Sequence, residues 1–256
     1  MRKKILLSVF LVLAVVAAAD MVVRERADIL RTSVPLLRDG AFLPVPAPAG
    51  IGEKIIYDVM LGKLRMGSAV FEYAARTELN QRAVDLFTFS TRAARFTDFE
   101  RIFSDPATFL PLRVERDISA WAKKEKIVEQ YDQQAFLLSV EKHTGGKQTT
   151  QSFKKESVIH NAVLLPSVVR RTHQIDPGWS FKANLPTQEF TITFAGIEEI
   201  TLPAGKFRAS RFTSFPERFE IWISADQYQI PLKIKGTSGI GYTLVMRTYI
   251  KPPGAS

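Results

Sequence analysis

The side chains best suited to catalysis or metal binding are few and widely spaced in this sequence. Its three histidines, His143, His160 and His173, are separated by seventeen and thirteen residues. No two of them can lie one turn apart on a helix, as an H-x-x-x-H zinc motif requires. Cysteine is absent, which excludes disulfides, thiolate ligands, a cysteine nucleophile and a cysteine-linked lipid anchor. We therefore predict solvent-exposed loop histidines, and no bound metal or cofactor.

A serine hydrolase needs a serine, a histidine and an acid that converge, commonly with the serine in a G-x-S-x-G turn. The sequence contains no such turn. The glycine-containing stretch 237–241 lies between two predicted strands and is not followed by a helix. It is typical of a hairpin turn and not of a phosphate-binding loop.

Three acidic residues, Asp98, Glu100 and Asp105, lie close together in the sequence among phenylalanines. Two carboxylates that flank a sugar bond are the catalytic pair of glycosidases. Three arginines between positions 92 and 101 lie beside these acids, however, so we predict ordinary surface ion pairs. The sequence thus predicts no catalytic residue and a protein that is not an enzyme, with a hydrolase as the third-ranked hypothesis.

One basic stretch beside an aromatic residue has two interpretations. The formal net charge is +9, and the stretch Trp121-Ala-Lys-Lys-Glu-Lys126 places an aromatic ring beside three lysines. In a cytosolic protein this pattern would suggest nucleic acid, which the export signal described below argues against. A solvated hairpin tip is the simpler interpretation, and an anionic lipid or another anionic envelope component is the binding alternative.

Phenylalanine is abundant, with 18 residues in the chain. Six of them gather in one region: Phe87, Phe89, Phe96, Phe99, Phe103 and Phe109. They are able either to line an open concave sheet that takes acyl chains or to fill a closed core. Both alternatives stay open at this point.

The elements that must position these side chains are predicted to be strands. The clearest pair is the stretch 219–235, where apolar residues alternate with others on both sides of the turn Ala225-Asp-Gln227. Roughly a dozen such segments follow one another between short turns. The stretch Asn161–Arg170 has helical spacing, with Pro166 near its start. This pattern predicts an all-β fold, mainly antiparallel, built as a strongly curved sheet or open barrel with one short helix.

The N-terminus has the pattern of an export signal that precedes this β-rich domain. Residues 1–19 begin with Arg2-Lys-Lys4, continue as an uncharged, mostly apolar run, and end in three alanines. We predict a signal peptide over 1–19, or an uncleaved anchor helix. Residues 20–50 include alternating prolines and form a predicted linker. The folded domain is expected over 51–250, in the periplasm and tethered to the inner membrane if the signal is not cleaved.

Several stretches of this domain together resemble one known family. They are Gly52-Glu-Lys54 with Tyr57, the glycines Gly62 and Gly67, the turn Pro203-Ala-Gly-Lys-Phe207, and the stretch from Ile221 to Ile234. They resemble the DUF3108 family of exported bacterial proteins of unknown function, over about 51–250. The resemblance implies an exported, β-rich envelope protein and assigns no catalytic or binding residue.

We therefore expect a non-enzymatic periplasmic protein of the cell envelope that binds a lipid or another amphipathic ligand on a concave sheet. Arginine and lysine at the rim would then meet anionic head groups. The alternative is a structural or interaction module that docks to another envelope protein by a sheet edge or face. Neither hypothesis involves nucleic acid, and the sequence leaves the oligomeric state open.

Overall fold

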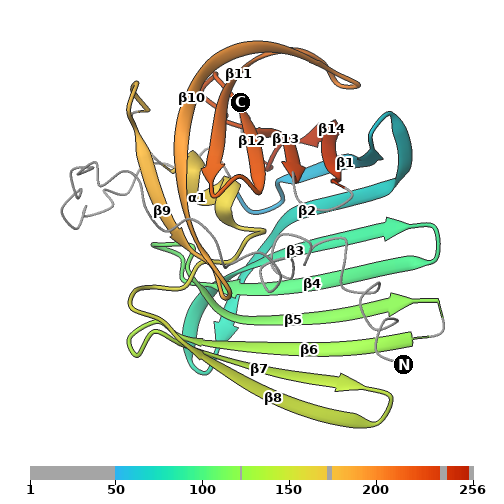
Figure 1. Ribbon diagram of the computed structural model, residues 1–256, viewed down its shortest axis with the longest axis vertical. Coiled ribbons are helices and arrows are strands. Elements are labelled where there is room, and N and C mark those ends of the chain that lie inside the picture. The colour runs from blue at the N-terminus through green and yellow to red at the C-terminus, as the bar shows by residue number, and fades with distance from the viewer. Residues whose placement is uncertain (1–49, 122, 172–174, 237–240, 254–256) are drawn as a thin grey trace, which may run out of the picture.

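The structure is a computed structural model that describes residues 50–121, 123–171, 175–236 and 241–253 (Figure 1). The predicted signal or anchor helix at 1–19 and the predicted linker up to residue 49 lie outside the described residues. His173 and most of the predicted hairpin turn at 237–241 lie outside them as well.

The described chain forms fourteen strands and one short helix. The first eight strands are β1 (Lys54–Leu61), β2 (Leu64–Leu79), β3 (Arg82–Ala93), β4 (Phe96–Ser104), β5 (Pro111–Ala120), β6 (Lys123–Asp132), β7 (Leu137–Thr144) and β8 (Lys147–Lys154). The helix α1 (Leu165–Arg170) follows, and then β9 (Ser180–Asn184), β10 (Glu189–Leu202), β11 (Gly205–Phe215), β12 (Phe219–Ser224), β13 (Pro231–Gly236) and β14 (Thr243–Ile250).

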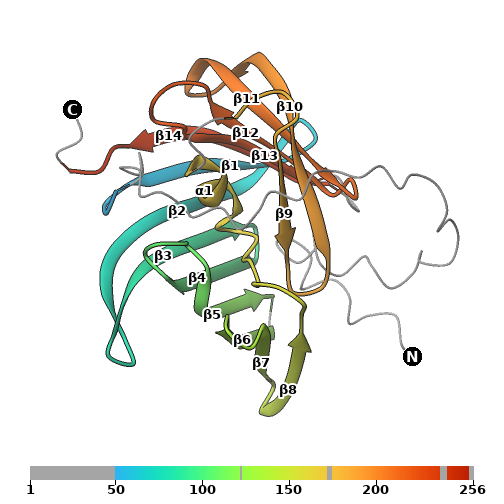
Figure 2. The same cartoon turned by 90° about the vertical axis from the view of Figure 1, so that its left-hand side faces the viewer.

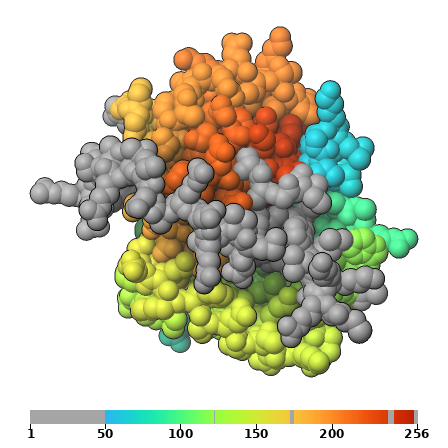
Figure 3. Space-filling model, in the orientation of Figure 1, coloured from blue at the N-terminus to red at the C-terminus, as the bar shows by residue number. Residues whose placement is uncertain are grey.

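All fourteen strands belong to one antiparallel sheet, in the order β8-β7-β6-β5-β4-β3-β2-β1-β14-β13-β12-β11-β10-β9. Consecutive strands pair as a meander, and β14 returns to pair with β1. Strands β8 and β9 are the two edges, so the sheet is open. It curls into an upper part of β9–β14 and a lower part of β3–β8, which the space-filling view shows one above the other (Figures 1 and 3). The prediction of an all-β, strongly curved antiparallel sheet is confirmed.

Bulges contribute to this curvature. The pairing register shifts between Ile56 and Tyr57 on β1, between Tyr73 and Ala75 on β2, and between Trp222 and Ile223 on β12. An extra residue on one strand bends that strand and increases the local twist. On the β12 side, Ile223 pairs with Pro231, whose missing N–H is tolerated at such an irregular position.

The short helix lies inside the curve of the sheet, and all six of its residues are buried (Figure 2). It begins at Leu165, later than the predicted Asn161, because Asn161 forms a turn instead. The Asn161 side-chain oxygen accepts the backbone N–H groups of Val163 and Leu164, at 2.9 and 3.3 Å. Pro166 occupies the first turn of the helix, where no N–H donor is needed. This helix is too short to cross a bilayer, and no described helix is long and apolar enough to do so.

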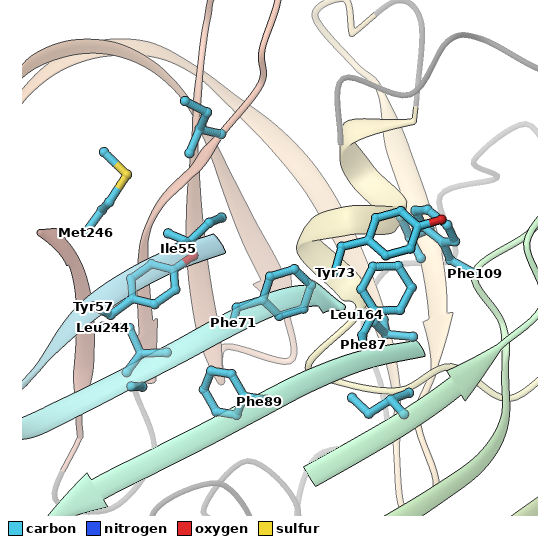
Figure 4. Packing of buried hydrophobic residues seen from close by; sticks show 14 of the residues in the cluster. Ile55, Tyr57, Phe71, Tyr73, Phe87, Phe89, Phe109, Leu164, Leu244 and Met246 are labelled. Atoms are coloured by element: carbon cyan, nitrogen blue, oxygen red, sulfur yellow. The ribbon is translucent and has the colours of Figure 1, made fainter. Parts of the chain in front are cut away.

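Two apolar clusters fill the space on either side of the helix. Leu164 and Val168 belong to the larger cluster, together with inward residues of β1–β5 and β14 (Figure 4). Leu165 and Val169 belong to the second cluster, which packs against β9–β12. Because residues one position apart point to different sides of a helix, this single turn and a half joins the two parts of the core.

A buried ion pair fixes the end of the helix. The guanidinium of Arg170 donates to both carboxylate oxygens of Glu53, at 2.9 and 2.8 Å, and to the carbonyl oxygen of Tyr228 at 2.9 Å. The hydroxyl of Tyr249 donates to Glu53 at 2.9 Å. The side chains of Glu53 and Arg170 are 0% and 1% exposed. Four separate segments of the chain, at residues 53, 170, 228 and 249, therefore meet at this pair.

Candidate functional site

A largely apolar cavity lies between the start of α1 and the inner face of the sheet. Its volume is about 870 Å³, counted with the open space at its mouth. The walls come from β1, β2, β3, β12, β13, β14 and residues 162–167. The apolar side chains include Phe71, Phe89, Leu165, Phe219, Ile221, Ile234 and Leu244, and the polar ones are Tyr57, Thr91, Ser167 and Tyr242.

Strand alternation positions this lining. Phe71 on β2 pairs directly with Phe89 on β3, so both rings project from the same inner face (Figure 4). Tyr57 on β1 lies on the same side, and its hydroxyl donates to the carbonyl oxygen of Pro231 at 2.9 Å. Burial raises the pKa of Tyr57 well above its ordinary value, so this wall residue stays neutral.

The six clustered phenylalanines divide between the two predicted roles. Phe89 lines the cavity, whereas Phe87 and Phe109 fill solid core beside it, with ring centroids 5.1 Å apart in an edge-to-face arrangement. Phe99 lies on the outer face and is 41% exposed. Phe96 and Phe103 are half-buried. The region therefore supplies both a packed core and part of a hollow.

The prediction of surface ion pairs is wrong for Asp98 and Glu100. Both point to the inner face of β4 and are only 3% and 2% exposed. Asp98 forms a hydrogen-bonded ion pair with the buried Arg116 on β5, and Glu100 lies 3.4 Å from the same guanidinium. The sequence argument relied on the arginines at 92–101, whereas the partner of both acids is Arg116 on the neighbouring strand. Asp105 pairs with Arg82 at 2.5 Å in an exposed turn, as expected of a surface acid.

Glu129 and Tyr131 on β6 complete this polar group. The Tyr131 hydroxyl donates to Glu129 at 2.5 Å. Burial, opposed by Arg116 and reinforced by the charges of Asp98 and Glu129, raises the pKa of Glu100 to about 8. Burial likewise raises the pKa of Glu129. We define the inner acidic cluster as Asp98, Glu100, Glu129 and Arg116.

The prediction of exposed loop histidines is wrong for His160. Its ring packs edge-to-face against Phe181, with centroids 5.1 Å apart, and its Nδ1 accepts the backbone N–H of Asn184 at 3.1 Å. Burial lowers the pKa of His160 to about 4, so it is neutral. His143 is exposed beside Glu141, although it lies in β7 and not in a loop. Among the described residues, no three His, Asp or Glu side chains are grouped to hold a metal ion.

The aromatic and basic stretch begins in the turn between β5 and β6 with Trp121, and its three lysines lie in β6. Trp121 is 65% exposed there, at a positive φ of 52°. Its backbone N–H donates to the carbonyl oxygen of Arg95 at 3.1 Å, which joins this turn to the one between β3 and β4. Trp121 thus belongs to a hairpin tip, and it lies outside the cavity.

A family model described as "Protein of unknown function (DUF3108)" matches residues 56–247 of this chain. The sequence matches no curated protein. A solved structure from Brucella abortus, described as a beta-barrel-like protein of domain of unknown function DUF1849, is similar with a TM-score of 0.48 and 10% identity. That likeness covers 79% of this chain and 98% of the other.

Two further solved structures are more distant. A candidate exported protein from Bacteroides fragilis, described with a YmcC-like fold, has a TM-score of 0.30 and 10% identity, and covers 80% of this chain and 98% of its own. A candidate lipoprotein from Parabacteroides distasonis has a TM-score of 0.27 and 7% identity, over 78% of this chain and 96% of the other.

Proposed function

Because this chain belongs to the DUF3108 family, whose function is unknown, we propose a function from its own site: a non-enzymatic envelope protein that binds an amphipathic ligand. The observation that carries the proposal is the apolar cavity beneath α1. Its lining is predominantly apolar, with a few hydroxyl groups, as in small-molecule sites. A lipid acyl chain would lose contact with water there by packing on Phe71, Phe89 and Leu244.

Two features favour binding over catalysis. The imidazole of His160 is engaged by the backbone of Asn184 and packs on Phe181, so it serves the packing between β9 and the segment before α1. The carboxylates of Asp98 and Glu100 share one guanidinium from Arg116 and are not arranged as a separate acid and base. Within the described part of the chain, His160, Asp98 and Glu100 thus each have a structural contact.

The proposed location is the periplasm, with the domain either released or tethered to the inner membrane. The support is the sequence pattern of residues 1–19. N-terminal sequencing of the protein isolated from its own cells tests it. A mature chain that begins at Asp20, recovered with the periplasmic fraction, is the expected result for a cleaved signal. An intact chain in the cytosolic fraction would refute export.

Ligand binding is tested on the purified full chain with dodecyl maltoside, whose head group is uncharged, below its critical micelle concentration. Isothermal titration calorimetry should detect saturable binding. Replacing Ala162, which lines the cavity, by phenylalanine should abolish it by filling the space. The control Ala83→Phe adds the same ring at an exposed position of β3 and should bind normally. The proposal would be overturned if neither the native chain nor the control bound the detergent. It would also be overturned if Ala162→Phe bound it normally.

One observation favours the alternative of an interaction module. Strand β8 is an edge of the sheet, no described strand pairs with its outer side, and all but one of its residues are exposed. A strand from another envelope protein could extend the sheet there through backbone hydrogen bonds. Pull-down from envelope extracts with the native chain and with a Thr150→Pro variant tests this. Loss of a specific partner in the variant supports docking at β8, and equal recovery contradicts it.

A further inference from the structure

We propose that the polar end of the bound ligand is a protonated amine, held by the inner acidic cluster. This inference rests on the proposed function, since it assigns the head group of the ligand whose apolar part occupies the cavity. It reverses the sequence-based expectation that anionic head groups meet basic residues, because the polar groups next to the cavity are mainly carboxylates.

The cavity and the cluster are neighbours on one continuous surface. Thr91 lines the cavity and is the cross-strand partner of Asp98. Phe89 also lines the cavity, and its cross-strand neighbour on β4 is Glu100. The cross-strand neighbour of Glu100 on β5 is Arg116. Neighbouring strands lie about 4.8 Å apart, so the inner face changes from apolar to acidic within one strand spacing. An amphiphile with its chain in the cavity would place its head over β4.

Tyr242 is a further lining residue with an electrostatic link to the cluster. Its side chain lines the cavity from the segment just before β14. Burial raises the pKa of Tyr242 to about 12, and the negative charge of Glu100 adds to the effect. Tyr242 is consistent with the strand-pairing argument for a cluster next to the cavity.

The cluster holds more carboxyl groups than cationic groups. Asp98, Glu100 and Glu129 bring three carboxyl groups against the single guanidinium of Arg116. The next inward acid along the sheet, Glu125, is already paired with Lys123 and Lys142, at 2.6 and 2.8 Å. Ionised carboxyls without a counter-charge are strongly disfavoured in a buried place. In the free protein the raised pKa of Glu100 relieves this repulsion by protonation, whereas a cation supplied by the ligand would favour the ionised carboxylate and an anion would disfavour it.

Two buried polar atoms beside the cavity lack hydrogen-bond partners among the described residues. They are Oδ1 of Asp98 and Oγ1 of Thr91, whereas Oε1 of Glu100 has only the ion-pair contact with Nε of Arg116 at 3.4 Å. Buried polar atoms in folded proteins almost always have partners. An alkylammonium group carries three N–H donors and no acceptor, so it matches such a set. The described residues hold no group of three metal-ligating side chains, which favours an organic cation over a metal ion.

Three probes with the same dodecyl chain separate the head groups: dodecylamine, dodecyl maltoside and dodecyl sulfate, each below its critical micelle concentration. Calorimetry on the purified full chain should give a dissociation constant at least tenfold lower for dodecylamine than for dodecyl maltoside, with dodecyl sulfate the weakest. The net charge of +9 opposes non-specific attraction of an amine to the protein surface. Equal affinity for amine and maltoside, or a preference for sulfate, would overturn the inference.

Matched variants locate the effect. Glu100→Gln should weaken dodecylamine binding about tenfold and leave dodecyl maltoside within twofold. Asp98→Asn is a second variant with the same expected pattern, which keeps the test valid if Glu100→Gln does not fold. Asp117→Asn removes one charge from the exposed, outer side of β5 and should change neither affinity.

The outcomes distinguish this inference from the function on which it rests. If Ala162→Phe abolishes maltoside binding and the native chain shows no preference for the amine, the amine head group is refuted. The proposed binding in the cavity then stands. No binding of any dodecyl probe would refute both. If both Glu100→Gln and Asp98→Asn keep the amine preference, the cation binds elsewhere. The inner acidic cluster is then refuted as its binding site.

Discussion

Replacing Glu53 by glutamine should destabilise the whole domain, because it leaves the charge of Arg170 buried without a counter-charge. The carboxylate of Glu53 receives two hydrogen bonds from Arg170 and one from Tyr249, and its side chain is fully buried. Breaking a buried pair by removing one partner typically costs about 3–5 kcal/mol of unfolding free energy. Glutamine keeps the shape of the side chain, so the loss measures the charge.

The magnitude can be checked by two routes. Urea unfolding followed by circular dichroism gives the unfolding free energy directly. A domain of this size loses roughly 2–4 °C of melting temperature per kcal/mol, so a decrease of about 6–20 °C is expected. The control Glu72→Gln removes an ion pair with Lys54, in which the charged atoms are 3.1 Å apart. Both side chains of that pair are about one-third exposed. That change should cost less than about 1 kcal/mol.

A double variant tests the reasoning further. Glu53→Gln combined with Arg170→Met removes both charges and should be less destabilised than the sum of the two single variants, since no unpaired charge remains. A loss below about 1 kcal/mol for Glu53→Gln would show that the pair is accessible to water or replaceable. Strict additivity would show that the two residues act independently, which contradicts the geometry.

Two further predictions concern burial and close packing. The pKa of His160 is lowered to about 4 in the folded state from an ordinary 6.5, so its contribution to stability is present above pH 6.5 and is lost as pH falls towards 4. Over this pH interval we expect the unfolding free energy of the native chain to fall by up to about 3 kcal/mol more than that of His160→Gln. Urea unfolding at each pH measures both values. Parallel pH profiles of the two proteins would contradict the prediction. Gly67→Ala places a methyl group 2.0 Å from the carbonyl oxygen of Arg92 and should cost about 2 kcal/mol or more. Gly62→Ala, with a positive φ of 58° and open space around it, should cost about 1–2 kcal/mol from backbone strain alone, so equal losses in the two glycine variants would contradict the steric argument.

The sequence by itself determined the secondary structure class and much of the strand order along the chain. Alternation of apolar and other residues, interrupted by turn residues such as Asp226, is a local property of the chain. Asp226 accepts the backbone N–H groups of Tyr228 and Gln229 in the turn between β12 and β13, as the sequence predicted for that turn. The helix near Pro166 was predictable for the same reason. These features depend on residues within a few positions of one another.

The family resemblance was also visible in the sequence, since its residues occupy turns and strand positions. The same local view failed for β4, where nearby arginines in the sequence suggested surface ion pairs for Asp98 and Glu100. Phe99 and Phe103 lie on the outer side, and Asp98 and Glu100 lie on the inner side. Alternation defines two faces of a strand, and only the direction in which the sheet curls decides which face becomes the interior.

The candidate site depends on tertiary structure alone. Glu53 and Arg170 are 117 positions apart, and His160 is buried by contacts with a strand that begins twenty residues later. The cavity exists because the open sheet curls around α1, and its acidic neighbour exists because Arg116 on β5 meets Asp98 on the adjacent strand β4. Local sequence patterns carry the preferences of each segment, but charge pairing, burial and hollow space arise between segments that only the folded sheet brings together.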